Sequence, residues 1–404
     1  MSAGRAASAA PRTYFDGLES FGLVVLLAGL PLGEAFKSAG LGLAVLGFAG
    51  KLATGYRPHI RPRAPLLALG LFLVAAVASV LTASGDARRP AELLTLSTTI
   101  AAFPLILDSV AARPTRRMLF LLAVLAGVFV SASVAYADHM LGPYHRLVLP
   151  SIENAVPAAE YLGACVAVGL ALTVTEIGAP VAGPLSALVT GLAAIALFMT
   201  KSRGPLIGAA GGCLVALAGT LRRVRPVLIV LLAVLCALWV FVAAYPGARI
   251  ADRSPGGRRG VASRVDTWHR TALLIAERPL TGYGLGSYSS LGVVYEDEEC
   301  IIRQPNAHNV WLHTAAETGL LGCGALTAFL VLGMVGSARA AFGRRGRRID
   351  RSVAAAALGG VTALLVAGLF SVTTDAEPGI LLFALLALGC ARPDSGSGRQ
   401  REEP

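Results

Sequence analysis

The chain has 404 residues, of which 55% are hydrophobic and only 15% are charged, and its mean hydropathy is +0.67. A soluble domain of this length could not keep so much apolar surface away from water. The composition therefore excludes a soluble globular protein and predicts a chain embedded in a lipid bilayer. We expect the formal net charge of +11 to lie in the loops between membrane spans, and we expect no nucleic-acid partner.

Apolar segments long enough to cross a bilayer follow one another along the chain. At a rise of about 1.5 Å per residue, a hydrocarbon core of about 30 Å needs roughly 20 residues. The cleanest candidates are 64–83, 116–136, 226–245, 311–335 and 353–373. Shorter or more polar candidates are 18–33, 38–52, 91–108, 157–177, 183–200, 205–221 and 378–391. The sequence therefore predicts an all-α polytopic membrane protein with about twelve transmembrane helices.

These spans divide the chain into nine transmembrane helices in residues 1–245, a long loop in 246–307, three more helices in 308–392 and a tail in 393–404. The first apolar stretch has no small-residue cleavage site, so we expect it to stay in the protein. Glu34 and Lys37 divide that stretch into two short segments, which could be two spans or a single kinked one.

Cationic residues in short loops predict the orientation of the chain. If both termini are cytoplasmic, 21 of the 35 Lys and Arg residues lie inside, and eight of the other 14 belong to the loop 246–307. The positive-inside rule has little force in a loop of that length. When that loop is left out, 21 Lys and Arg residues lie inside and six lie outside. This asymmetry predicts that the long loop is extracytoplasmic and that the tail is cytoplasmic.

The first candidate functional segment, Thr200–Pro205, lies where one predicted span ends outside and the next begins. We expect Gly204 and Pro205 to be the N-cap and first-turn residues of that next helix. Lys201 and Arg203 then stand beside a helix N-terminus, whose free N–H groups and dipole favour anions. An anion site is one interpretation, and a plain interfacial turn with snorkelling cations is the other.

The second segment is a helix predicted within the long loop, over Ser263–Glu277. Ser263 with Asp266 three residues later resembles a capping box, and Asp266 with Arg270 forms a favourable i,i+4 pair. Arg264 has no such local partner, so it is the better candidate to bind a ligand. An apolar face at helical spacing suits the membrane interface or the top of the bundle, and its members are Val265, Trp268, Ala272 and Ile275.

Two further stretches of the loop 246–307 are predicted to have no direct chemical role. The spaced glycines of 279–288 are neither preceded by a strand nor followed by a helix start, which favours a tight, mobile turn over a nucleotide-binding loop. The acidic run 296–299 is predicted to be a solvated charge run, with a divalent-cation site as the alternative. We therefore expect neither stretch to hold a metal or a cofactor.

The third segment, Pro305–His313, leads into the predicted span 311–335. Asn306 can cap the helix and would place His308 in its first turn, where the helix dipole disfavours imidazolium and keeps the ring a neutral base near pH 7. Glu317 lies nine residues further on, about half a turn away, so we do not expect it to orient His308. His313 is expected to be structural.

In chain order, these segments resemble the core of the O-antigen ligase and polymerase superfamily. The resemblance covers about residues 190–335. It is strongest at the last of its elements, which are Ser202-Arg203-Gly204, Arg264 with Trp268, the stretch 279–286, and His308-Asn309 followed by Gly319 and Gly322.

In that superfamily a glycan carried on undecaprenyl diphosphate is transferred to a sugar hydroxyl of lipid A–core, at the periplasmic face of the bacterial inner membrane. The resemblance implies a fold of the GT-C type, a lipid-diphosphate-linked donor, a lipid A–core acceptor, and neither a nucleotide sugar nor a metal. Matched position by position, it implies a catalytic role for His308 and donor-diphosphate binding by Arg203 and Arg264, to which we add Lys201. The supporting residues are Ser202, Asn309, Trp268 and Arg270.

One base on the acceptor side and cations on the donor side predict direct displacement with inversion at the anomeric carbon. A polymerase of repeat units, or a ligase acting on protein hydroxyls, would use the same residues, so both are alternatives. A polysaccharide or lipid transporter is an alternative of another class. Transporters tend to place ionisable residues at the membrane midplane and to show two related halves, whereas the candidate residues lie at the outer helix ends and the sequence shows no internal repeat.

Overall fold

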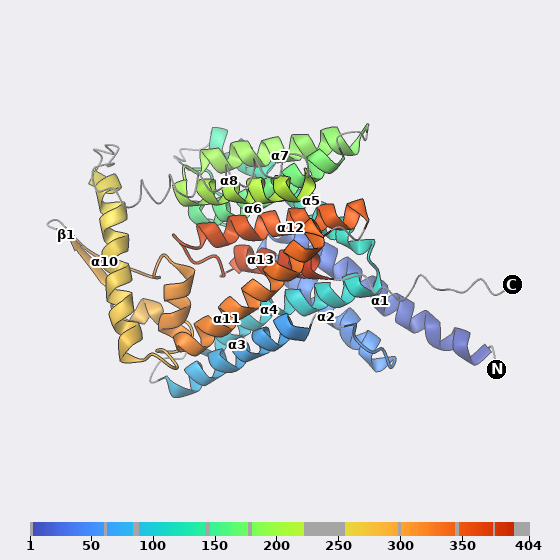
Figure 1. Ribbon diagram of the computed structural model, residues 1–404, viewed down its shortest axis with the longest axis horizontal. Helices are drawn as coiled ribbons and strands as arrows, with labels where there is room; N and C mark the ends of the chain where they lie inside the picture. Colours follow the sequence, from blue (N-terminus) through green and yellow to red (C-terminus); the bar gives the residue numbers. More distant parts are fainter. Residues whose placement is uncertain are drawn as a thin grey trace.

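The computed structural model describes residues 3–59, 63–83, 89–141, 146–176, 180–221, 255–297, 300–343, 347–374 and 376–391. They form a bundle of helices with a smaller assembly at one end (Figure 1). The bundle helices are α1 (Ala3–Gly29), α2 (Glu34–Ala53), α3 (Arg63–Thr82), α4 (Arg89–Ala112), α5 (Arg116–Leu141), α6 (Ala155–Thr175), α7 (Ala182–Met199), α8 (Arg203–Thr220), α11 (Val310–Phe342), α12 (Arg348–Ala367) and α13 (Ala376–Cys390).

The smaller assembly comes from the long loop that precedes α11. Its elements are α10 (Pro255–Glu277), a short 3-10 helix η1 (Tyr288–Ser290), and an antiparallel hairpin of β1 (Val294–Asp297) and β2 (Cys300–Arg303). In Figure 1, α10 runs across one end of the bundle, and α1 begins at the other. We call these the α10 end and the terminal end.

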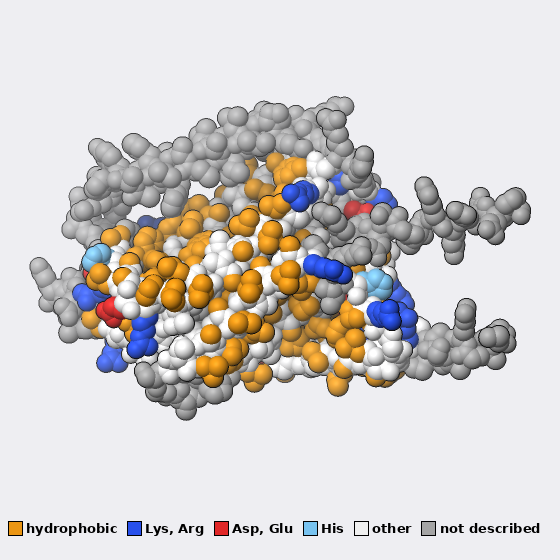
Figure 2. Space-filling view, turned by 60° about the horizontal axis from the view of Figure 1, so that its bottom comes forward, with side chains coloured by type: hydrophobic (Ala, Val, Ile, Leu, Met, Phe, Trp, Pro, Cys, Tyr) orange, Lys and Arg blue, Asp and Glu red, His pale blue; other side chains and the backbone are white. Residues whose placement is uncertain are grey.

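Eight of the described helices are long and apolar enough to cross a membrane: α2, α3, α4, α5, α6, α7, α11 and α12. Together with the predominance of helix, this confirms the predicted all-α polytopic membrane protein. Figure 2 shows hydrophobic side chains over the middle of the visible face, with Lys and Arg toward its two ends. The predicted spans 18–33, 205–221 and 378–391 fall in α1, α8 and α13, which do not reach the same combination of length and hydropathy. The predicted span 226–245 and the tail 393–404 lie outside the described residues.

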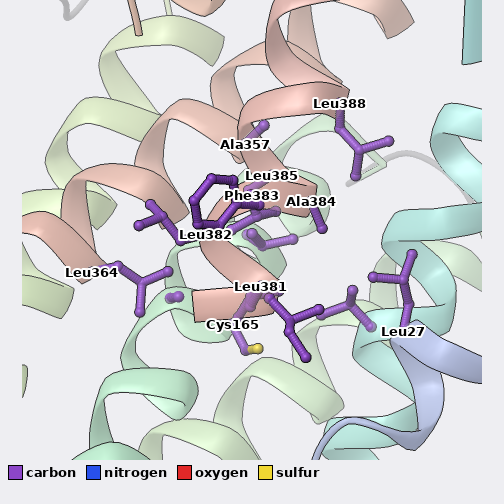
Figure 3. Packing of buried hydrophobic residues seen from close by; sticks show 14 of the residues in the cluster. Leu27, Cys165, Ala357, Leu364, Leu381, Leu382, Phe383, Ala384, Leu385 and Leu388 are labelled. Carbon is purple, nitrogen blue, oxygen red and sulfur yellow. The ribbon is translucent and has the colours of Figure 1, made fainter. Parts of the chain in front are cut away.

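Helix α13 lies at the centre of the bundle, and nearly all of its residues are buried. Figure 3 shows its leucines and Phe383 packed against residues of α1, α6 and α12. Phe329 of α11 stacks on Phe383 at a centroid distance of 5.2 Å. Small residues bring other helices still closer, because a Cβ at Gly208 or Gly212 of α8 would overlap backbone oxygens of α12.

A buried ion network holds the terminal end of the bundle together. Lys51 Nζ lies 2.8 Å from Asp108 Oδ2 and also contacts Glu19, and all three side chains are almost completely buried. Arg116 makes a bidentate pair with Asp16, at 2.9 and 2.7 Å. Lys51 and Arg116 belong to the group predicted to be cytoplasmic, whereas Lys201, Arg203 and Arg264, which are predicted to lie outside, are at the α10 end. These described cations thus lie at opposite ends of the bundle, and the sidedness itself stays a prediction.

Helix α11 is sharply bent at Gly319, whose φ of 70° and ψ of −179° are not helical. The Cys323 Sγ lies 3.6 Å from the carbonyl oxygen of Trp311, although twelve residues of straight helix would separate them by about 18 Å. The part 310–318 therefore folds back at the α10 end, and the part 320–342 runs through the bundle. The predicted continuous span 311–335 is wrong in this respect, because a glycine in the left-handed region interrupts it.

We predict that Gly319→Ala destabilises the protein, whereas Gly324→Ala, five residues further along α11, does not. A Cβ at Gly319 would be strained by the positive φ and would overlap the carbonyl oxygen of Leu280, while a Cβ at Gly324 meets no atom within 4 Å. The strain alone costs more than about 1 kcal/mol. Thermal unfolding of the two purified variants in detergent measures the difference, and equal unfolding temperatures would contradict the bend at Gly319.

Candidate functional site

The three segments singled out in the sequence all lie at the α10 end. The connection 368–374 between α12 and α13 links the first segment to the third. Asn309 Nδ2 donates a hydrogen bond of 3.2 Å to the carbonyl oxygen of Leu369, and a Cβ at Gly204 would lie 3.3 Å from the Cβ of Phe370. The sequence gives no sign of this role, because residues 368–374 carry no charge and no recognisable motif.

The start of α8 differs from the predicted start by two residues. The helix begins at Arg203 with Ser202 as its N-cap, so the prediction that Gly204 and Pro205 begin the helix is wrong. Pro205 falls in the first turn, where its missing N–H costs nothing, and the helix can start before it. The Ser202 side chain makes no capping hydrogen bond and instead lies 3.4 Å from the carbonyl oxygen of Ala155.

Lys201 and Arg203 flank this N-cap, and both side chains are exposed at the α10 end. Lys201 adopts a left-handed backbone with φ of 55°, and its carbonyl oxygen accepts a hydrogen bond of 3.2 Å from Arg146 Nη2. Two cations therefore stand beside the positive end of the α8 dipole, which is an arrangement suited to an anion.

Helix α10 begins at Pro255, so the predicted start at Ser263 is wrong by eight residues. The predicted pairing of Asp266 with Arg270 is confirmed, since Arg270 Nε lies 2.8 Å from Asp266 Oδ2. Such a pair needs only the four-residue spacing of a helix, which explains why the sequence identifies it.

The face that α10 turns toward the protein is not the predicted apolar one. Thr267 and Thr271 are completely buried, whereas Val265 is 58% exposed. The Thr271 hydroxyl lies 2.6 Å from both the carbonyl oxygen of Thr267 and the hydroxyl of Tyr288, so its burial leaves no hydrogen-bonding group unsatisfied. Trp268 and Ile275 are half-buried and Ala272 is exposed. Arg264, one turn before Trp268, shares the inward face.

Arg264 is half-buried near His308, and burial lowers the pKa of its guanidinium. No carboxylate among the described residues pairs with it. A guanidinium without a partner carboxylate, held partly away from water, can bind an anionic ligand with little competition. The contrast with Arg270, which is neutralised by Asp266, matches the distinction predicted from their spacing.

His308 does not lie in the first turn of α11, as predicted, but immediately before its N-cap. The cap is Asn309, whose Oδ1 accepts hydrogen bonds of 3.0 Å from the N–H groups of Trp311 and Leu312. Asn306 instead accepts a hydrogen bond of 3.0 Å from the N–H of His308, two residues on. That Asx turn bends the chain before the helix begins. It holds His308 at a φ of 49°, a backbone conformation that is rare for a side-chain-bearing residue.

Three groups surround the imidazole of His308. Its Nε2 lies 3.2 Å from Gln304 Oε1. Burial lowers the pKa of His308 below its ordinary value of 6.5, and the positive charge of Arg264 and the neighbouring His313 act in the same direction. The lowered pKa favours the neutral ring at pH 7, and burial, not a helix dipole, is its main cause.

Glu317, which the sequence did not predict to orient His308, contacts residues that adjoin the site. Its Oε1 accepts a hydrogen bond of 3.1 Å from the N–H of Tyr288 and lies 3.6 Å from His313 Nε2. The Tyr288 and His313 rings are 5.1 Å apart. The buried carboxylate thus fixes the chain that leads out of the glycine segment, while Gln304 contacts His308. Sequence spacing correctly excluded Glu317 as the partner of His308 but could not find Gln304.

The glycine segment 279–286 was predicted to be a tight, mobile turn, but the structure shows it docked on α11. The N–H groups of Tyr283 and Gly284 each donate a hydrogen bond of 2.9 Å, to the carbonyl oxygens of Ala316 and Glu317. The N–H of Leu320 returns a bond of 2.7 Å to Pro279. These α11 groups are free for such bonds because the bend at Gly319 breaks the helical ladder. The close approach to α11 requires glycine at position 282, where φ is 66° and a Cβ would lie 2.6 Å from the carbonyl oxygen of Ala316.

Comparison with known protein families gives one match. Residues 188–326 match the family described as O-antigen ligase. The matched part runs from α7 to the first turns of the membrane-crossing part of α11, so it contains all three segments of the site. No curated protein matches the chain.

Proposed function

We propose that this chain, whose residues 188–326 match the O-antigen ligase family, is an O-antigen ligase. It would transfer a glycan from undecaprenyl diphosphate to a sugar hydroxyl of lipid A–core at the periplasmic face of the bacterial inner membrane. The observation that carries the proposal is a half-buried His308 beside Arg264, at the same end of the bundle as Lys201 and Arg203, the two cations that flank the N-cap of α8.

The cations suit the donor side of this reaction. The leaving group is a diphosphate, and negative charge accumulates on it as the glycosidic bond breaks. Arg264, Arg203 and Lys201 would bind that charge, together with the free N–H groups at the start of α8. Guanidinium groups are well suited to this task, because their planar N–H groups match two phosphate oxygens at once.

His308 suits the acceptor side. A sugar hydroxyl is a poor nucleophile until it loses its proton, and a neutral imidazole can take that proton as attack proceeds. The diphosphate leaves without a general acid, so a single base is sufficient. Attack by the hydroxyl opposite the departing diphosphate would invert the configuration at the anomeric carbon. A glycosyl group trapped covalently on the protein would contradict this direct displacement.

Supporting residues hold these groups in place. Asn309 would fix the start of α11 and tie it to the connection 368–374, and Trp268 would shield the side of the site formed by α10. Ser202 would set the direction of α8, and Arg270 would stabilise α10 through Asp266.

We expect His308→Ala to lower glycan transfer by at least about 100-fold, because a general base typically contributes 10²–10⁴-fold. Cells carrying the variant should lose O-antigen from lipopolysaccharide gels and accumulate undecaprenyl-linked polymer, while immunoblots show normal insertion. The matched control is His269→Ala, which removes an exposed imidazole from α10. A normal O-antigen ladder in the His308 variant would remove this residue from the mechanism.

We expect Arg264→Ala to lower transfer by about 10²–10³-fold, the usual loss when one donor to a developing negative charge is removed. Arg270→Ala should lose much less, because its guanidinium is already neutralised by Asp266. Initial rates with purified variants and lipid-linked donor give the comparison. Equal losses in both variants would argue against a specific role of Arg264 at the diphosphate.

The acceptor and the absence of a metal need a separate test, since a repeat-unit polymerase or a protein O-oligosaccharyltransferase would use the same residues. Purified protein with lipid-linked donor and EDTA is offered lipid A–core, a second donor molecule or a pilin-like protein. We expect lipid A–core to be glycosylated in EDTA. Modification of another acceptor would replace the ligase proposal with that alternative, and a requirement for metal would contradict the predicted metal-free reaction.

A further inference from the structure

We infer that Gln304 is a positioning residue for His308: its side-chain amide oxygen holds the Nε2–H of the imidazole and leaves Nδ1 as the atom that accepts the proton. This inference rests on the proposed function and deepens it, because it assigns the proton-accepting atom and the residue that selects it.

Gln304 is itself held firmly. It follows β2 directly, its backbone N–H donates a hydrogen bond of 2.9 Å to the carbonyl oxygen of Val293, and the residue is only 7% exposed. Val293 and Ala307 are buried with Tyr288 in a small apolar cluster under α10. A side chain anchored in this way can orient a neighbour, since it has few other positions to adopt.

His308 is constrained from its other side. The Asx turn from Asn306 and the left-handed φ of 49° fix the backbone from which the ring projects. With the backbone fixed, the contact of 3.2 Å between Nε2 and Gln304 Oε1 restricts the rotation of the imidazole ring. Nδ1 is then the ring nitrogen available to an acceptor.

The chemistry of the amide decides which nitrogen carries the proton. An amide oxygen only accepts hydrogen bonds, so the Nε2 that faces it is protonated in the neutral ring, and the lone pair lies on Nδ1. The charged and titratable groups that face His308 within the described residues are Arg264 from α10 and His313 from α11. Gln304 is neutral, so it orients the ring without the stabilisation of imidazolium that a carboxylate would provide.

These groups account for the proton and the electron pairs that move during the transfer. The acceptor O–H gives its proton to Nδ1 as its oxygen forms a bond to the anomeric carbon. The bond between that carbon and the diphosphate oxygen breaks, and its electron pair leaves with the diphosphate. The resulting imidazolium keeps its Nε2–H on Gln304 throughout.

The test compares Gln304→Glu and Gln304→Met in the full-length protein, by the pH dependence of kcat/KM with lipid-linked donor and lipid A–core. A carboxylate at position 304 would stabilise imidazolium, so we expect Gln304→Glu to move the loss of activity at low pH upward by about 1–3 pH units. Gln304→Met should lower transfer by about 10- to 100-fold, as removal of an orienting partner does, without that upward movement. Ser289→Glu adds the same charge at an exposed position of η1 and should leave the profile in place.

Nitrogen NMR of ¹⁵N-histidine-labelled protein tests the same inference without an activity assay. The His308→Ala variant assigns the signal of His308. We expect the Nε2–H tautomer in the wild type and a raised titration midpoint of His308 in Gln304→Glu. An Nδ1–H tautomer, an unmoved midpoint, or a Gln304→Met protein as active as the wild type would overturn the positioning role. The expected NMR result in a wild-type protein that transfers no glycan would support the positioning role and contradict the ligase proposal.

Discussion

The bend of α11 at Gly319 is the feature on which the α10 end depends. A helix that ran straight through this point would satisfy its own backbone groups and would offer none to another segment. Because the left-handed glycine breaks the ladder, the carbonyl oxygens of Ala316 and Glu317 receive the chain from 282 to 284. That docking fixes the segment between α10 and the hairpin.

Charge is distributed in two different ways at the two ends of the bundle. At the terminal end, cations such as Lys51 and Arg116 are buried and fully paired with carboxylates, which stabilises helix packing. At the α10 end, Lys201 and Arg203 are exposed and Arg264 has no partner carboxylate among the described residues. Paired charges contribute to the fold, whereas Arg264, which has no carboxylate partner among the described residues, suits the binding of an anion. This contrast supports the proposed diphosphate site more than the number of arginines does.

The ion pair predicted from helical spacing agrees with the structure, whereas the apolar face of α10 and the helix starts predicted from capping residues do not. The Asp266–Arg270 pair follows from one turn of helix. Helix α10 begins eight residues before Ser263, the cap that the sequence suggested. The starts of α8 and α11 differ from the predicted ones because Ser202, Asn306 and Asn309 can all cap a helix or form a turn, and local sequence does not decide between them. For α11 this moved His308 out of the helix and into a strained turn, which is a more specific position for a base.

The sequence by itself determined that the chain spans a membrane, because its long apolar segments are stable in a lipid bilayer and not in water. It also identified the arginines, the lysine and the histidine of the matched family segment as candidate site residues. Only the tertiary structure decided which of them meet. Gln304, Glu317 and the connection 368–374 have no pattern that distinguishes them in the sequence. Their roles come from contacts between distant segments: Asn309 with Leu369 across sixty residues, and Glu317 with Tyr288 across twenty-nine. Such contacts depend on how the helices pack around the bend at Gly319, and no local periodicity encodes that packing.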